Sequence, residues 1–270
     1  MSKYISAFVA ATLLLSLGSC FDPPIYPLAP QVSFDGIRFV QIEGQDSLVL
    51  SFDFRDGDGD IGLSDDDNTP PFHRVNLILD STATFVFNEQ VGGFVVEDVS
   101  TGFVEFGDEG NKNPYYLVSN FGTLVGVYSE DPIVLPDFGC RDYIPVTDVE
   151  GDTTGADKQD TLLIEPNEFL NNINITFLRQ RNGQLEDITG AFAPDACSDP
   201  FDSRIPIFDT DNLGRPLDGT INYPMLSSGF ISNFLNDSII IEFYIYDRAL
   251  NRSNIERTQP FTLPGLLGIN

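Results

Sequence analysis

Asp46-Ser-Leu-Val-Leu-Ser-Phe-Asp-Phe-Arg-Asp56 is matched, without a gap, by Asp237-Ser-Ile-Ile-Ile-Glu-Phe-Tyr-Ile-Tyr-Asp247 near the other end of the chain. Each stretch begins with an Asp-Ser pair and continues with apolar residues at alternate positions. Side chains of a β-strand point to opposite faces in turn, so this pattern predicts a strand with one face on a core. The final aspartate predicts a turn. Two copies of one unit predict two related β-sandwich domains, which we place at residues 32–145 and 155–270.

The rest of the chain follows the same β pattern. Helical periodicity is nearly absent, and short runs of β-branched and aromatic residues are separated by Gly, Asn, Asp and Pro. The expected strands are residues 37–42, 47–54, 75–80, 84–87, 94–96, 115–118, 123–128, 173–179, 185–188, 220–223, 238–246 and 255–263. Arg181-Asn182-Gly183 predicts a hairpin turn. Residues 165–170 predict one helical turn, and the acidic segment 147–160 is the expected domain boundary. The expected fold class is all-β.

The later copy continues as Tyr246-Asp247-Arg-Ala-Leu250-Asn251-Arg-Ser253-Asn254. This stretch resembles the Asp-x-x-Gly-Asn-x-Ser turn near the end of many bacterial immunoglobulin-like domains, where the turn joins the last two strands. Leu250 stands where that family has glycine, so the match is partial. The resemblance implies an immunoglobulin-like β-sandwich.

The N-terminus is typical of an exported lipoprotein. Lys3 precedes an apolar stretch at residues 5–17, and residues 17–20 read Leu-Gly-Ser-Cys. This order predicts a secretory signal at residues 1–19, because a membrane span needs about 20 apolar residues. The tetrapeptide resembles the lipobox of bacterial lipoproteins, which implies that Cys20 becomes a lipidated first residue that holds the protein to a membrane. An ordinary cleaved signal with an incidental cysteine is the alternative.

A proline-rich tether is expected at residues 20–31, because its four prolines are incompatible with a helix or an inner strand. The whole chain carries a formal net charge of −27, which disfavours nucleic acid and anionic lipid as partners. Calcium and cationic ligands remain compatible with this charge, although acidity also serves solubility alone. A hydrophobic content of 41% with 23 Phe is sufficient for a packed core.

Two further cysteines, Cys140 and Cys197, form an even pair in an exported chain. Such a pair predicts a disulfide, which would stabilise the fold by about 3–4 kcal/mol in the chain-entropy model. A metal site at these cysteines is disfavoured, because the sequence has no Cys-x-x-Cys and its only histidine, His73, is distant.

The chemically most specific segment is Asp56-Gly-Asp58-Gly-Asp60-Ile-Gly-Leu-Ser64-Asp-Asp-Asp67. Alternate carboxylates with glycines between them can converge on one hard cation. Counted as a twelve-residue calcium loop, Asp56, Asp58 and Asp60 take positions 1, 3 and 5, Ser64 position 9 and Asp67 position 12. These five residues are the candidate metal ligands, and calcium is the candidate cofactor.

The loop departs from an EF-hand, because its sixth position lacks glycine, its last lacks glutamate, and a strand leads into it. It resembles the wider class of Asp-x-Asp-x-Asp calcium loops in extracellular β-proteins. In the alternative interpretation Asp56 only caps a turn, as Asp247 would in the second copy, and the other carboxylates are solvated.

The sequence contains few residues and motifs typical of enzymes. His73 is the only histidine, and no Gly-x-Ser-x-Gly or His-Glu-x-x-His motif occurs. We therefore expect a protein that is not an enzyme, with no catalytic residue assigned. Paired carboxylates, as in a glycoside hydrolase, are the alternative that abundant Asp and Glu leave open.

Three motifs occur together: Cys20-Phe-Asp-Pro-Pro, Asp-Gly-Asp-Gly-Asp-Ile-Gly-Leu at residues 56–63 and Asp-Arg-Ala-Leu-Asn-Arg-Ser-Asn at residues 247–254. The arrangement resembles a family of uncharacterised lipoproteins of Gram-negative bacteria. The resemblance implies an outer-membrane lipoprotein of the cell envelope, facing the periplasm or the surface, but it implies no activity. Our leading hypothesis is a non-catalytic, calcium-stabilised interaction module that binds an unknown envelope protein or glycan. A glycan-binding accessory lipoprotein of a polysaccharide uptake system is the second hypothesis, which the absence of Trp disfavours.

Overall fold

Strands dominate the computed structural model, and the all-β expectation is confirmed. The structure describes residues 24–42, 45–79, 85–88, 93–96, 116–120, 123–127, 137, 139, 141–145, 161–192, 200–208, 214–226, 229–235 and 237–268. The predicted lipidation residue Cys20 and the predicted disulfide partners Cys140 and Cys197 lie outside these ranges. Within them, no helix has the length and apolar composition needed to cross a membrane.

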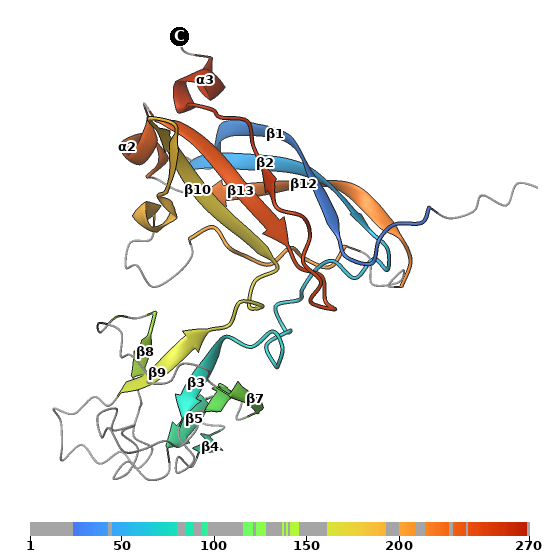
Figure 1. Ribbon diagram of the computed structural model, residues 1–270, viewed down its shortest axis with the longest axis vertical. Helices are drawn as coiled ribbons and strands as arrows, with labels where there is room; N and C mark the ends of the chain where they lie inside the picture. Colours follow the sequence, from blue (N-terminus) through green and yellow to red (C-terminus); the bar gives the residue numbers. More distant parts are fainter. Residues whose placement is uncertain are drawn as a thin grey trace, which may run out of the picture.

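Two antiparallel sheets pack into a sandwich (Figure 1). The first sheet has the order β1 (Gln31–Ile42), β2 (Gln45–Asp56) and β12 (Leu217–Leu226). The second has the order β11 (Gln184–Asp187), β10 (Ile173–Arg181), β13 (Ser238–Ile245) and β14 (Glu256–Arg257). The predicted hairpin turn joins β10 to β11, with Asn182 and Gly183 both at positive φ.

The matched stretches form the central strands of the two sheets, β2 and β13, and line one shared core. Their alternating apolar residues point inward, and Leu50, Phe52 and Phe243 are fully buried. The rings of Phe52 and Phe243 meet between the sheets with centroids 5.0 Å apart. Truncating one of these phenylalanines to alanine would cost about 3–5 kcal/mol, because the cavity adds to the lost transfer free energy.

Short helices close one end of the sandwich. Phe230 and Phe234 of α2 (Phe230–Phe234) pack against Phe177 of β10. The strand expected at residues 255–263 is limited to β14, and the chain ends instead in α3 (Leu263–Leu267). The Thr262 side chain accepts a hydrogen bond from the Gly265 amide there, which is a helix cap that favours α3 over a longer strand.

A separate sheet lies beside the sandwich at the bottom of Figure 1. Its order is β7 (Leu124–Val127), β6 (Tyr116–Ser119), β3 (Val75–Leu79), β9 (Thr161–Pro166) and β8 (Tyr143–Pro145), and a hairpin of β4 (Phe85–Asn88) and β5 (Gly93–Val96) accompanies it. The helical turn expected at residues 165–170 is instead the end of β9 followed by a non-helical turn. The Asn167 side chain fixes this turn by donating to the carbonyls of Pro71 and His73.

The sheets do not follow the division expected between residues 145 and 155. β2 pairs along its length with β12, so the first sandwich sheet combines strands from both ends of the chain. The second sandwich sheet packs against it around one core. The chain leaves the sandwich after β2, forms the separate five-stranded sheet between β3 and β9, and returns with β10 (Figure 1). The repeat therefore marks two strands in equivalent environments of one core, which is why it resembled two domains in the sequence.

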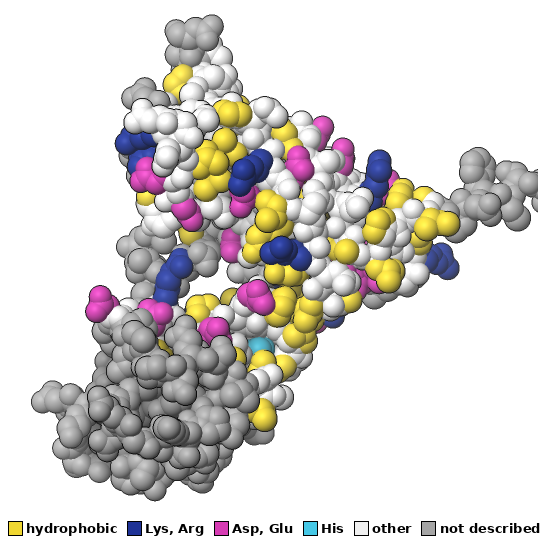
Figure 2. Space-filling view, viewed as in Figure 1, with side chains coloured by type: hydrophobic (Ala, Val, Ile, Leu, Met, Phe, Trp, Pro, Cys, Tyr) yellow, Lys and Arg dark blue, Asp and Glu magenta, His cyan; other side chains and the backbone are white. Residues whose placement is uncertain are grey.

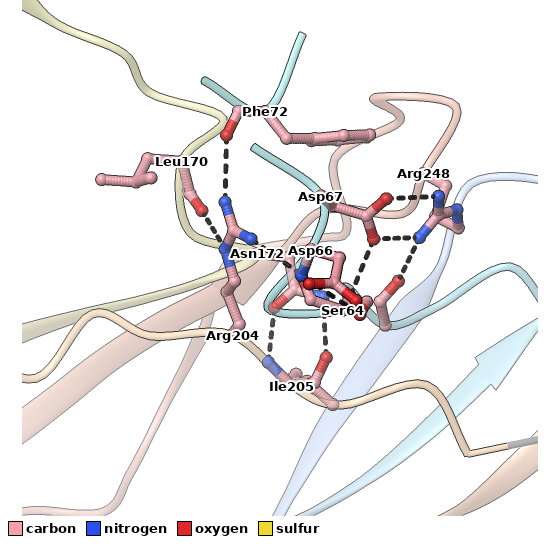
Figure 3. A network of polar contacts seen from close by, with 10 residues as sticks. Ser64, Asp66, Asp67, Phe72, Leu170, Asn172, Arg204, Ile205 and Arg248 are labelled. Carbon is pink, nitrogen blue, oxygen red and sulfur yellow. Dashed lines mark hydrogen bonds and ion pairs between the residues drawn. The ribbon is translucent and has the colours of Figure 1, made fainter. Parts of the chain in front are cut away.

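Arg204 joins the two parts of the molecule. Its guanidinium donates to the carbonyls of Leu170, Ser64 and Phe72 at 2.8, 2.8 and 2.9 Å (Figure 3). Leu170 follows β9, whereas Ser64 and Phe72 lie between β2 and β3, so one side chain links both connections between the two parts. On the visible face of the sandwich, acidic and basic side chains are interspersed rather than gathered into patches of one sign (Figure 2).

Candidate metal centre

Four aspartates converge where β2 and β13 end. Asp56 is the last residue of β2, Asp58 and Asp60 follow it, and Asp247 lies two residues beyond β13. Each contributes a carboxylate oxygen to a group whose members all lie within 4.8 Å of one another. Asp56 and Asp247 are only 0% and 1% exposed, whereas Asp58 and Asp60 are half-buried. We call these four residues the aspartate cluster.

The two turns that form the cluster share one backbone geometry. The Asp56 carboxylate accepts from the amide of Asp60 at 2.9 Å, and the Asp247 carboxylate accepts from the amide of Asn251 at 2.7 Å. The residue before each amide is left-handed, with φ 65° at Gly59 and 66° at Leu250. Asp56 thus does cap a turn, as one interpretation of the sequence proposed, and the same carboxylate belongs to the cluster.

The glycines between the aspartates allow close backbone approach. A Cβ at Gly57 would lie 2.6 Å from the carbonyl oxygen of Pro27, and one at Gly59 would collide with the carbonyl oxygen of Arg215. The Asp58 carbonyl accepts from the amide of Gly214 at 2.6 Å. The loop is therefore held against the chain on both sides, which fixes where its carboxylates point.

The cluster is electrostatically unfavourable without a cation. Burial raises the pKa of Asp56 to about 7, and the negative charges of Asp58 and Asp60 act in the same direction. Burial, followed by the charges of Asp247 and Asp58, raises the pKa of Asp60 to about 6. Burial also raises the pKa of Asp247. Each shift shows that the surroundings disfavour the negatively charged form.

Three oxygens of the cluster have no hydrogen-bond partner. They are the buried Oδ1 atoms of Asp56, Asp58 and Asp60, among the residues that the structure describes. A buried polar atom without a partner costs about 1–3 kcal/mol, and more when it is charged. Oxygens around one calcium ion lie about 2.3–2.6 Å from it and so at most about 5 Å apart, which matches the spacing of the cluster. The aspartate cluster could therefore hold a metal ion.

Ser64 and Asp67, the other two candidate ligands, lie outside the cluster. The Asp67 carboxylate makes two hydrogen bonds with the Arg248 guanidinium, at 2.6 and 3.0 Å, and accepts from the Ser64 amide (Figure 3). The hydrogen bond from Arg248 lowers the pKa of Asp67. The loop does not curl back to complete a twelve-residue cage, because Ile61 and Leu63 turn inward and are 1% and 3% exposed.

Asp247 completes the cluster, whereas counting along the loop predicts Ser64 and Asp67 as the remaining ligands. The sequence predicts Asp247 only as the unliganded counterpart of Asp56 and does not place it in the site. The signal was nevertheless present in the matched stretches. Two equivalent strands that face each other in one sandwich can bring their terminal aspartates together, whereas two separate domains would not.

His73 has a structural role. It is 1% exposed, its Nε2 is 2.6 Å from Oδ1 of Asn76, and its Nδ1 is 3.3 Å from the amide nitrogen of Asn167. Both ring nitrogens thus face asparagine amides rather than a nucleophile or a carboxylate.

Comparison of the chain with protein-family models, with curated proteins and with solved structures finds no match.

Proposed function

We propose that the protein is a non-catalytic, lipid-anchored interaction module of the bacterial cell envelope whose sandwich is stabilised by calcium at the aspartate cluster. The observation that carries the calcium proposal is the convergence of buried, unpartnered oxygens of Asp56, Asp58 and Asp60 on the buried Asp247. The lipobox, the tether and the immunoglobulin-like turn in the sequence support the envelope location and the binding role.

The chemistry of the cluster favours calcium over other common metals. All four side chains offer carboxylate oxygens, which suit hard cations, whereas zinc sites use His and Cys. Magnesium requires near-ideal octahedral geometry and usually retains several waters. Calcium accepts six to eight oxygens in variable geometry, which suits four carboxylates from two different turns.

A cation at this position would join the two sheets. Asp56, Asp58 and Asp60 follow a strand of the first sheet, and Asp247 follows a strand of the second. An ion bound to all four therefore acts as a cross-link that exists only in the folded chain. Such a ligand stabilises the fold by about 2.7 kcal/mol at a hundredfold excess over its Kd.

Calcium-dependent melting of the purified protein tests this proposal. We expect saturating calcium to raise the Tm by about 5–10 °C over the protein in EDTA. Asp58→Asn removes one ligand charge and should abolish most of the rise. Asp66→Asn is the matched control, because Asp66 is an exposed aspartate of the same segment outside the cluster. An unchanged wild-type Tm, or an equal loss in both variants, would refute the calcium site.

The second function, a glycan-binding accessory lipoprotein, is distinguished by its ligand. An array of glycans would show specific binding under that hypothesis, whereas capture of an envelope protein would support the first. A pocket lined by described residues, separate from the aspartate cluster, supports this second hypothesis by its size.

A further inference from the structure

A cavity of about 340 Å³ lies where the sandwich meets the separate five-stranded sheet. Its polar side chains are Asp65, Asn68, Arg74, Asn120 and Arg204. Phe72 and Leu170 provide its apolar wall. Small-molecule sites commonly measure about 300–1,000 Å³ and combine apolar walls with a few converging polar groups. We call this cavity the junction pocket.

Several polar groups of the junction pocket have no partner among the residues that the structure describes. Oδ1 of Asn120 is buried and accepts no hydrogen bond, as far as the described residues show. In the same ranges no carboxylate pairs with the exposed Arg74 guanidinium, and the side chains of Asp65 and Asn68 make no hydrogen bond. Most buried acceptors in proteins are paired, so an unpartnered amide oxygen at a cavity indicates a missing donor.

The Arg204 guanidinium, unlike that of Arg74, has hydrogen-bond partners among the described residues. Its three hydrogen bonds to backbone carbonyls hold it in place, but those partners are neutral (Figure 3). Nearby Asp67 is already bonded to Arg248. The pocket thus holds two guanidinium groups against the single carboxylate of Asp65, in a chain with a net charge of −27. Two guanidinium groups beside one carboxylate in the lining of the pocket favour an anionic ligand.

We propose that the junction pocket binds a small hydroxylated carboxylate, of which a hexuronic acid is the simplest example. The Arg74 fork matches a carboxylate, which can accept two N–H bonds from it. Sugar hydroxyls supply the donors that Asp65 and Oδ1 of Asn120 require. Leu170 and Phe72 contact the C–H surface of the ring. This binding goes beyond the proposed calcium site, since no cluster aspartate lines the pocket.

Calorimetric titration with glucuronate, at saturating calcium, tests the proposal on the purified protein. We expect a Kd of about 1 mM, as suits a ligand of this size. Glucose presents similar hydroxyls without the carboxylate and should bind at least about tenfold more weakly. Absence of glucuronate binding at about 10 mM, or equal binding of glucose, would overturn the proposal.

Variants locate the binding within the pocket. Arg74→Ala should weaken glucuronate binding by about tenfold or more, because it removes a charged hydrogen-bonding partner. Arg38→Ala is the matched control, because Arg38 lies on β1 outside the pocket lining and its guanidinium donates to Oδ1 of Asn222. Asn120→Asp is nearly isosteric and should also weaken binding by about tenfold, because it places a like charge beside the ligand.

The calcium response of each variant distinguishes ligand binding in the junction pocket from calcium binding at the aspartate cluster. Arg74→Ala and Asn120→Asp should keep the wild-type rise of Tm with calcium, which shows that each is folded with its aspartate cluster intact. Glucuronate binding that persists unchanged in both variants would place the ligand elsewhere and overturn the assignment. A missing calcium response in the wild type would refute the calcium site alone.

Discussion

The turn after β2 and the turn after β13 have one backbone geometry but different chemistry. Both begin with a buried aspartate that accepts a hydrogen bond from the amide four residues later. In both, the residue just before that amide has φ near 65°. The first turn carries carboxylates at Asp58 and Asp60, where the second has Ala249 and Asn251. The comparison shows that local sequence determines each turn, whereas the cluster requires the two turns to meet.

The largest expected effect comes from Gly59→Ala in the first turn. Gly59 has positive φ, and a Cβ there would collide with the carbonyl oxygen of Arg215. The free energy of unfolding should fall by about 3 kcal/mol or more, and the calcium response should disappear with the turn geometry. Chemical denaturation in calcium measures the first effect. A loss below about 0.5 kcal/mol would contradict this packing.

Asp56→Asn should change the stability in opposite directions with and without calcium. In EDTA the variant should be more stable by about 1–2 kcal/mol, because burial and like charges disfavour the ionised Asp56. The new amide oxygen can still accept from the Asp60 amide. With calcium the variant should be less stable than the wild type, because a ligand charge is lost. Asp53→Asn, on the exposed side of β2, is the control and should show neither effect. Melting in EDTA and in calcium distinguishes these outcomes.

Calcium affinity should fall as the pH decreases. Without the ion, the folded chain has a pKa of about 7 at Asp56 and about 6 at Asp60, both above the usual value near 4. Lowering the pH from about 8 to about 5 therefore stabilises the metal-free form by protonation, whereas calcium needs both groups ionised. The apparent Kd should rise by about tenfold per pH unit for each proton displaced. A pH-independent Kd from calorimetry would contradict the assigned ligands.

The smallest effect is expected from Leu250→Gly in the second turn. Leu250 has the same positive φ as Gly59, and glycine removes that strain but increases the entropy of the unfolded chain. We expect the free energy of unfolding to change by less than about 1 kcal/mol, with the calcium response retained. Denaturation curves of this variant beside those of Gly59→Ala compare the two turns directly. A loss of several kcal/mol would show that the Leu250 side chain has a packing role.

The strands of the sandwich were largely predictable, because the alternation in β2 and β13 records which face is buried. The number of domains was not, since a repeat identifies equivalent environments and does not show whether they belong to one core. β9 was missed because residues 161–166 follow an acidic segment and end in Pro166, which is typical of a loop.

The candidate site was predictable in part. Asp56, Asp58 and Asp60 follow one another in sequence, so their convergence could be inferred from spacing alone. Asp67 was assigned by counting along the loop, but Arg248, distant in sequence, binds its carboxylate. Asp247 enters the cluster only through the packing of two sheets, which local sequence does not encode.

The most direct test of a cation site shared by the two turns compares Asp247→Asn with Asp67→Asn in a calorimetric calcium titration. The shared site predicts that Asp247→Asn weakens calcium binding by about tenfold or more, because it removes a ligand charge. It predicts that Asp67→Asn leaves the Kd within about twofold, although losing the bond to Arg248 lowers stability. The reverse result, with Asp67 essential and Asp247 dispensable, would contradict the shared site and restore a loop that binds calcium alone.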